Sequence, residues 1–206
     1  VATNDAVYKS RDGGGTWERF PSFSARRVTT LALDPLLPAT IYAVTLWDSV
    51  YKSPDGGQHW LPHNVGLKEH VSFVNQFVFH PIVSEKIYIA TTVGAFYTKD
   101  AGREWEERMN GMKEVHIVTA IAMNPKAHTT LYGGTTGGMY RSEDGAMSWK
   151  RINNGLIPES ELMASMALGV NAIEIDQTNP TIVYAGTTKG LFRTVNKGEQ
   201  WERIGP

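Results

Sequence analysis

Carboxylates and tryptophans at one fixed spacing are the residues of this chain that could do chemistry. In five segments an Asp or Asn stands five residues before a Trp. Carboxylates in pairs could serve a glycosidase as acid and base, or could bind a metal. An active site, however, needs one convergent set of groups, whereas a turn is needed in every repeat. The repetition therefore favours turn-forming pairs: Asp12 and Trp17, Asp55 and Trp60, Asp100 and Trp105, Asp144 and Trp149, Asn196 and Trp201.

The histidines do not have the spacing of a metal site. There are six, dispersed over the chain: His59, His63, His70, His80, His116 and His128. His59 and His63 would lie about 13 Å apart on a strand, too far for one ion. The chain has no cysteine, which excludes disulfides, thiolate zinc sites and a cysteine nucleophile. We therefore expect neither a metal nor a cofactor, and no motif of a common hydrolase or nucleotide-binding site is present.

Charge and hydropathy exclude two classes of partner. Twenty Lys and Arg against 21 Asp and Glu give a net charge of -1, without the basic surface that a nucleic-acid binder needs. No apolar run reaches the roughly 18 residues of a membrane span. We expect no nucleic-acid partner and no membrane span.

The elements that must position these residues form a repeat of about 44 residues. A block beginning with Val recurs at Val28, Val74, Val118 and Val170, followed by short apolar runs such as TIYAVT and then VYKS. Each unit reads as four short strands separated by turns, without a helical period. Such four-stranded antiparallel units bury both faces only when copies stack, which predicts an all-β propeller in a single domain over 1–206. The expected blades are 1–27 (partial), 28–73, 74–117, 118–169 and 170–206.

The predicted first blade lacks its first strand, because VATND and AVYKS correspond to the second and third strands of a unit. At the other end WERIGP is a fourth strand, so nothing supplies the absent strand by closure. Four complete repeats and a partial one fit either a five-bladed propeller or an excerpt of one with roughly six to eight blades, and we favour the excerpt. Glu174, where other units have Ala or Val, agrees with an open face on the last blade.

Ser10 to Trp17 match the pattern S-x-D-x-G-x-T-W, and Ser53 to Trp60 match it with His59 in the Thr place. These segments, with looser copies ending at Trp105, Trp149 and Trp201, resemble the Asp-box or BNR repeat. The family includes sialidase-like, sortilin-like and photosystem II assembly factor-like propellers. The resemblance implies a box between the third and fourth strands on the outer part of each blade, and an extracellular or periplasmic location.

Enzymes of this family leave no recognisable signature in the chain. The F/Y-R-I-P motif that carries the first sialidase arginine is absent, and Arg26-Arg27 lies in SARRVTT instead. Xyloglucan-cleaving relatives have similar strands but span two seven-bladed propellers, for which this chain is too short. The catalytic residues, if there are any, stay unknown.

Segments that differ between blades are where specificity is expected in a repeat protein. The connection from Trp149 to Val170 is the longest, and within it Pro158 to Leu168 is predicted to be a short helix. That helix could offer an apolar patch to a partner, or it could fold onto the blade edge. Trp47 lies outside the boxes and with Asp48 could stack on and hydrogen-bond a sugar, or pack at the rim.

Connections between blades and turns between second and third strands emerge at one end of a blade, which we call the loop-rich face. Its candidate partner-binding residues are Arg26, Arg27, Trp47, Asp48, His70, His116, Leu162, Met163, Met166 and Lys189. The mixed charges suit a protein surface. The sequence thus favours a non-catalytic recognition or assembly scaffold for a protein partner; the alternative is a carbohydrate-active propeller, either a lectin or a glycosidase of sialidase or xyloglucanase type.

Overall fold

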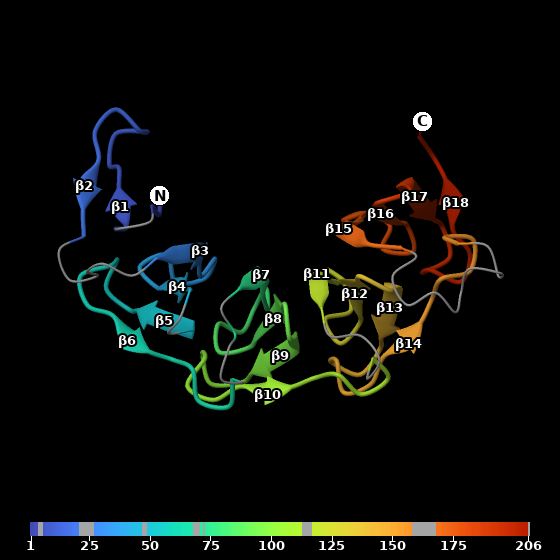
Figure 1. Cartoon of the computed structure of the whole chain (residues 1–206), viewed down its shortest axis with the longest axis horizontal. Coiled ribbons are helices and arrows are strands. Elements are labelled where there is room, and N and C mark those ends of the chain that lie inside the picture. The colour runs from blue at the N-terminus through green and yellow to red at the C-terminus, as the bar shows by residue number, and fades with distance from the viewer. Residues whose placement is uncertain are drawn as a thin grey trace.

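The computed structural model describes residues 1–3, 6–20, 27–46, 49–67, 71, 73–112, 117–157 and 168–205. These residues form four four-stranded antiparallel sheets and one two-stranded sheet. The sheets follow one another around a U-shaped arc, with the two terminal sheets on either side of its open end (Figure 1). Over these ranges the chain contains no helix, and therefore none that could cross a membrane.

The sheets are numbered as blades 1 to 5 in chain order. Blade 1 contains β1 (Tyr8–Lys9) and β2 (Glu18–Arg19). Blade 2 contains β3 (Val28–Leu33), β4 (Ile41–Thr45), β5 (Ser49–Ser53) and β6 (Leu61–Pro62). Blade 3 contains β7 (Val74–Phe79), β8 (Ile87–Thr91), β9 (Gly94–Thr98) and β10 (Glu106–Glu107). Blade 4 contains β11 (Val118–Met123), β12 (Leu131–Thr135), β13 (Gly138–Ser142) and β14 (Lys150–Arg151), and blade 5 contains β15 (Val170–Ile175), β16 (Val183–Thr187), β17 (Gly190–Thr194) and β18 (Glu202–Arg203).

Each complete blade is a meander in which strands consecutive in sequence are paired. In blades 2 to 4 every residue of the second strand is buried, because this strand lies between two paired neighbours and under two neighbouring sheets. The fourth strands have two exposed residues each and form the outer edge. The predicted all-β propeller of four-stranded antiparallel blades is confirmed.

Blade 1 differs from the other four. Besides β1 and β2 it contains only an antiparallel bridge between Ala2 and Val7, and no described residue occupies the place of a first strand. At the far end of the arc Glu174 is exposed on β15, as expected from its place on an open face.

The two kinds of loop that make up the loop-rich face lie side by side. In blades 2 and 3 the backbone N–H of Leu46 donates to Arg27 O (2.9 Å) and that of Thr92 to Phe73 O (3.4 Å). Blades 4 and 5 repeat this bond from Thr136 to Ile117 O and from Thr188 to Gly169 O. The turn after each second strand is thereby tied to the connection that precedes each first strand.

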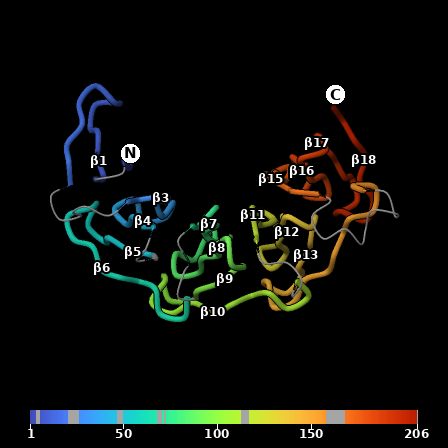
Figure 2. The backbone as a smooth tube through the Cα atoms, viewed as in Figure 1, coloured from blue at the N-terminus to red at the C-terminus, as the bar shows by residue number. Residues whose placement is uncertain are grey.

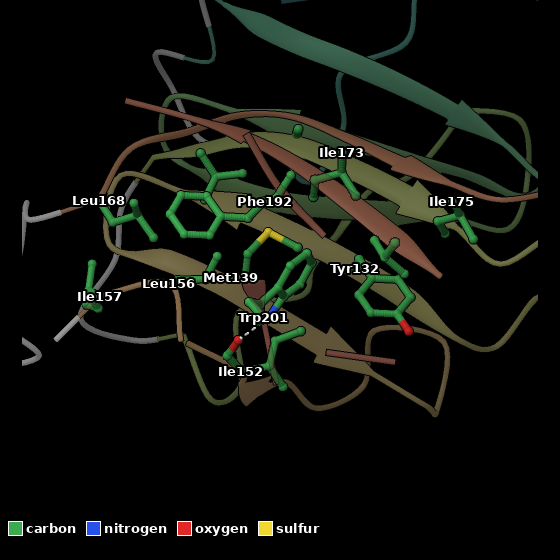
Figure 3. Close-up of a cluster of buried hydrophobic side chains, with 14 residues drawn as sticks. Tyr132, Met139, Ile152, Leu156, Ile157, Leu168, Ile173, Ile175, Phe192 and Trp201 are labelled. Atoms are coloured by element: carbon green, nitrogen blue, oxygen red, sulfur yellow. Dashed lines mark hydrogen bonds between the residues drawn. The ribbon is translucent and has the colours of Figure 1, made fainter. Parts of the chain in front are cut away.

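The core lies between blades. Its largest cluster, drawn in Figure 3, joins the first three strands of blade 4 and the segment after its fourth strand to the sheet of blade 5. It includes Tyr132, Met139 and Ile152 on one side and Phe192 and Trp201 on the other. Two similar clusters lie between blades 2 and 3 and between blades 3 and 4. Stability is therefore built at the contacts between neighbouring sheets.

One expectation about the long connection is wrong at its last residue. Leu168, predicted to end a helix, is fully buried and forms a parallel bridge with Gly137 in the preceding blade. An apolar side chain next to Gly169 gains more from entering the core between blades than from ending an exposed helical turn. The rest of the predicted helix, 158–167, lies outside the described residues.

Candidate functional site

The Asp-box of blade 4 holds its turn together with its own side chains. Asp144 Oδ1 accepts from Ser142 Oγ (2.8 Å) and from the Ser148 N–H (2.9 Å), while Oδ2 accepts from Ser148 Oγ (2.6 Å). Ser142 Oγ in turn accepts from the Ala146 N–H. Burial favours the neutral acid, but these hydrogen bonds outweigh it and lower the pKa of Asp144. The carboxylate stays ionised, and its oxygens accept the hydrogen bonds that hold the turn.

The other boxes repeat this arrangement with small changes. Hydrogen bonds from Thr16 and Ser10 lower the pKa of Asp12, and those from His59 lower the pKa of Asp55. Asp100 accepts from Thr98 Oγ1 (2.7 Å), and Asn196 accepts from Thr194 Oγ1 (2.7 Å). Carboxylates with lowered pKa values, whose oxygens already accept hydrogen bonds from the turn, are typical of a structural turn. A general acid instead needs a raised pKa.

The tryptophans of the boxes connect neighbouring blades. The indole N–H donates to the backbone carbonyl at the end of the preceding blade: Trp105 to His63 (2.9 Å), Trp149 to Arg108 (2.9 Å) and Trp201 to Ile152 (2.8 Å). Figure 3 shows the last of these bonds within the cluster between blades 4 and 5. Trp60 donates instead to Gly57 O in its own box, and Trp17 is 48% exposed because no sheet precedes it in the structure.

Three glycines at these junctions were missed by the sequence analysis. Gly66, Gly111 and Gly155 have φ between +81° and +92°, and a Cβ on each would lie 2.0–2.2 Å from the carbonyl oxygen of the next blade's Trp. The backbones approach so closely that only glycine fits. The signal was available: a Gly followed by Leu or Met stands six residues after Trp60, Trp105 and Trp149.

Two of the predicted loop-rich-face residues lie among the described ones. Arg27, just before β3, and Lys189, between β16 and β17, are both exposed. They belong to blades 2 and 5, which are separated along the arc by blades 3 and 4 (Figure 2). The other eight lie outside the described residues: Arg26, Trp47, Asp48, His70, His116, Leu162, Met163 and Met166.

One groove lies between blade 1 and the first strand of blade 2. Its volume is about 790 Å³, and its lining is mostly apolar, including Val7, Trp17, Phe20, Leu31 and Leu33. A second groove of about 320 Å³ runs along the first strands of blades 3 to 5 and contains one carboxylate, Glu174. Neither groove contains the close carboxylate pair that glycoside hydrolysis requires.

Two histidines from neighbouring blades contact each other edge to face, with the rings of His80 and His128 4.7 Å apart. Burial, with the nearby His128 and Lys86 charges, lowers the pKa of His80. His80 Nδ1 accepts from the Ile82 N–H, so that nitrogen caps a turn. Across the described ranges no group of three or more His, Asp or Glu is arranged to hold a metal ion.

Known structures share this fold. A xyloglucanase of glycoside hydrolase family 74 from Xanthomonas campestris aligns with a TM-score of 0.74 and 20% identity, over 99% of this chain and 34% of that one. YCF48 bound to a D1 peptide aligns with a TM-score of 0.65 and 18% identity, over 100% and 64%. The extracellular domain of the putative one component system BT4673 from B. thetaiotaomicron aligns with a TM-score of 0.71 and 15% identity, over 98% and 25%.

These likenesses establish the fold and leave activity open, since enzymes and other proteins share it. The chain spans between 26% and 34% of the length of the family 74 chains that it matches. Comparison with curated protein sequences gave no match. The family model described as "Sortilin, neurotensin receptor 3" matches residues 5–134, well over half of the sequence. The chain therefore belongs to the Sortilin, neurotensin receptor 3 family of Asp-box propellers.

Proposed function

We propose that this chain is a recognition or assembly scaffold that holds a protein partner on its loop-rich face. The observation that carries the proposal is the state of the repeated acids. Asp12, Asp55, Asp100 and Asp144 all accept hydrogen bonds within their own turns and have lowered pKa values. The repeated framework thus provides rigidity, and the segments that vary between blades are left to provide specificity.

Two further features support a polypeptide as the ligand. Arg27 and Lys189 are exposed, and the sequences of the other loops assigned to the loop-rich face add acidic residues, so we expect mixed charge on this face. Mixed charge favours selective contact with another protein over attraction to a polyanion. The solved structure of YCF48, which has this fold, contains a bound D1 peptide.

The test is a pull-down from extracts of cells that make the protein, comparing the wild type with two variants. Met163→Asp combined with Met166→Asp should abolish recovery of the partner, because it would place two charges in the apolar patch that the sequence predicts. The matched control is Ile82→Asp, a 71% exposed position in the turn between β7 and β8, away from the loop-rich face. The control should recover the partner as the wild type does. Equal recovery by the double variant would reject this segment as the partner site.

A carbohydrate ligand is the second candidate, favoured by the fold shared with family 74 enzymes and by the adjacent Trp47 and Asp48. An aromatic ring beside a carboxylate can stack on a sugar and accept its hydroxyl hydrogen bonds. A glycan array and a panel of chromogenic glycosides would separate the two functions. Turnover that disappears in Asp48→Asn would overturn the scaffold proposal, whereas glycan binding without turnover would indicate a lectin.

We also infer that the protein acts outside the cytoplasm, in an extracellular or periplasmic space. The support is the fold shared with extracellular domains from B. thetaiotaomicron. Fractionation of the producing cells tests this, and recovery only in the cytoplasmic fraction would contradict it.

A further inference from the structure

Met147 differs from the other methionines of the described residues in being largely exposed. It stands in the Asp-box of blade 4 and is 56% exposed. Met112 and Met139 are at most 1% exposed. Met109 and Met123 are partly buried against the core between blades 3 and 4. A peroxide reaches an exposed thioether, whereas packed side chains protect a buried one, so Met147 is the described sulfur most open to oxidation.

The sulfur of Met147 lies against a cation of the preceding blade. Arg108 Nη1 donates to Met147 Sδ (2.9 Å), and Nη2 donates to Glu106 Oε2 (2.6 Å). The guanidinium lies over the ring of Tyr97, 5.1 Å from its centre, and the Arg108 side chain is only 17% exposed. A thioether is a weak acceptor. The buried Nε of Arg108 meets no acceptor among the described residues, so this guanidinium has more donor capacity than its surroundings accept.

The backbone around Met147 is fixed to the same preceding blade. Asn110 Nδ2 donates to Met147 O (3.4 Å), and the backbone N–H of Trp149 donates to Asn110 O (2.9 Å). These bonds tie the box of blade 4 to the segment that follows β10. The sulfur therefore faces Arg108 from a backbone that both blades hold in place.

The next junction shows what a stronger acceptor does at this position. Glu199 stands two residues before Trp201, as Met147 stands two residues before Trp149. Arg141 of blade 4 donates from Nη2 to Glu199 Oε1 (2.9 Å) and from Nη1 to the backbone carbonyl of Lys197 (2.7 Å). A cation binds a charged oxygen more strongly than a neutral sulfur. Both junctions thus place a guanidinium against the same box position, which holds a carboxylate in blade 5 and a thioether in blade 4.

We propose that Met147 is a site of oxidation by peroxides, and that its sulfoxide strengthens the contact between blades 3 and 4. A lone pair of Met147 Sδ attacks one oxygen of hydrogen peroxide, the O–O bond breaks and an S–O bond forms. The departing hydroxide takes the proton of the transferred hydroxyl group and leaves as water, so the sulfur is oxidised and the peroxide is reduced. The sulfoxide oxygen, which carries partial negative charge, then accepts from Arg108 as Glu199 accepts from Arg141. Because Met147 is exposed, the new polar group enters no core.

Peptide mapping by mass spectrometry after treatment with dilute hydrogen peroxide tests the site. In the folded protein Met147 should gain one oxygen at least about ten times faster than Met112 and Met139, because only the first is exposed. In urea the three should react at similar rates. Oxidation of Met112 or Met139 as fast as Met147 in the folded protein would overturn the assignment.

The midpoint of thermal unfolding tests the effect of the sulfoxide. The matched control is Met147→Leu, which has a similar volume and cannot be oxidised at this position. Peroxide should raise the midpoint of the wild type by about 2 °C relative to its effect on this control. Met147→Gln carries an amide oxygen at the same place and should unfold above Met147→Leu without peroxide.

Arg108→Gln tests whether the guanidinium is the group that the new oxygen contacts. In this background neither peroxide nor Met147→Gln should raise the midpoint relative to Met147→Leu. A wild type that loses stability on oxidation relative to the control would overturn the proposal. The same conclusion would follow if Met147→Gln gave no gain, or if either gain persisted without Arg108.

Discussion

Trp201 and Trp17 occupy the same place in the same motif, yet only one of them contributes to a core. Trp201 is 2% exposed, packs between blades 4 and 5 and donates to Ile152, whereas Trp17 is 48% exposed at the head of the arc. Their boxes do not differ in this way, since Asp12 and Asn196 both hold their turns with the flanking hydroxyl and backbone groups. The Asp-box thus forms its turn from local hydrogen bonds, whereas the contribution of its tryptophan to stability depends on the neighbouring blade.

The largest expected effect comes from truncating the two tryptophans. Trp201→Ala should lower the free energy of unfolding by about 3–5 kcal/mol, because it leaves a cavity between two sheets and an unpaired carbonyl. Trp17→Ala should lower it by less than about 1 kcal/mol, since that side chain is half exposed. Urea denaturation measures both losses. Equal losses would mean that the packing between blades does not stabilise the arc.

A smaller effect is expected from adding one methyl group at a junction. Gly155→Ala should cost at least about 2 kcal/mol, because its Cβ would lie 2.2 Å from the Trp201 carbonyl oxygen at a φ of +86°. Gly13→Ala, at a φ of +72° with no atom within 4 Å of its Cβ, should cost about 1 kcal/mol. Thermal unfolding compares the two variants. If both shift the midpoint equally, backbone conformation and not close approach explains the junction glycines.

The smallest effect concerns acid stability and should be the same along the arc. The folded-state pKa of Asp144 lies below the ordinary value of 3.8, so its contribution is present above about pH 4 and is lost as pH falls through the lowered pKa. Asp144→Asn removes that titration and should flatten the decrease of unfolding free energy below pH 4 by a few tenths of a kcal/mol. Asp12→Asn should act in the same direction, because its turn is equally local. A response at only one of the two sites would contradict the conclusion that each box turn is stabilised independently of its neighbouring blades.

Much of the fold could be predicted because its signals are local. The blades could be predicted from the spacing of the tryptophans, the alternation of apolar residues and the turn residues. Alignment of the repeats predicted that blade 1 lacks its first strand. The junction glycines were not predicted, because the groups that require glycine belong to the next blade. These groups are the backbone carbonyls of Trp105, Trp149 and Trp201. The position of Leu168 was mispredicted because its helix-forming neighbours in the sequence give no information about Gly137. Leu168 pairs with Gly137 in a bridge that only the folded chain forms.

The candidate site was less predictable than the fold. Sequence differences between repeats identify the loops that vary, but they do not show how the loops of different blades meet. The structure ties each turn to its adjoining connection through backbone bonds such as that from Leu46 to Arg27. It also separates Arg27 and Lys189 by two intervening blades, so the two do not belong to one small pocket.

The sequence by itself determined the repeat, its strands and the role of the box aspartates, since each of these depends on residues within about ten positions of one another. Only the tertiary structure decided which tryptophans enter a core between described blades and which glycines cannot be replaced. Those outcomes depend on contacts between residues about 40 or more positions apart, such as Trp201 and Ile152, and such contacts exist only once the sheets have packed.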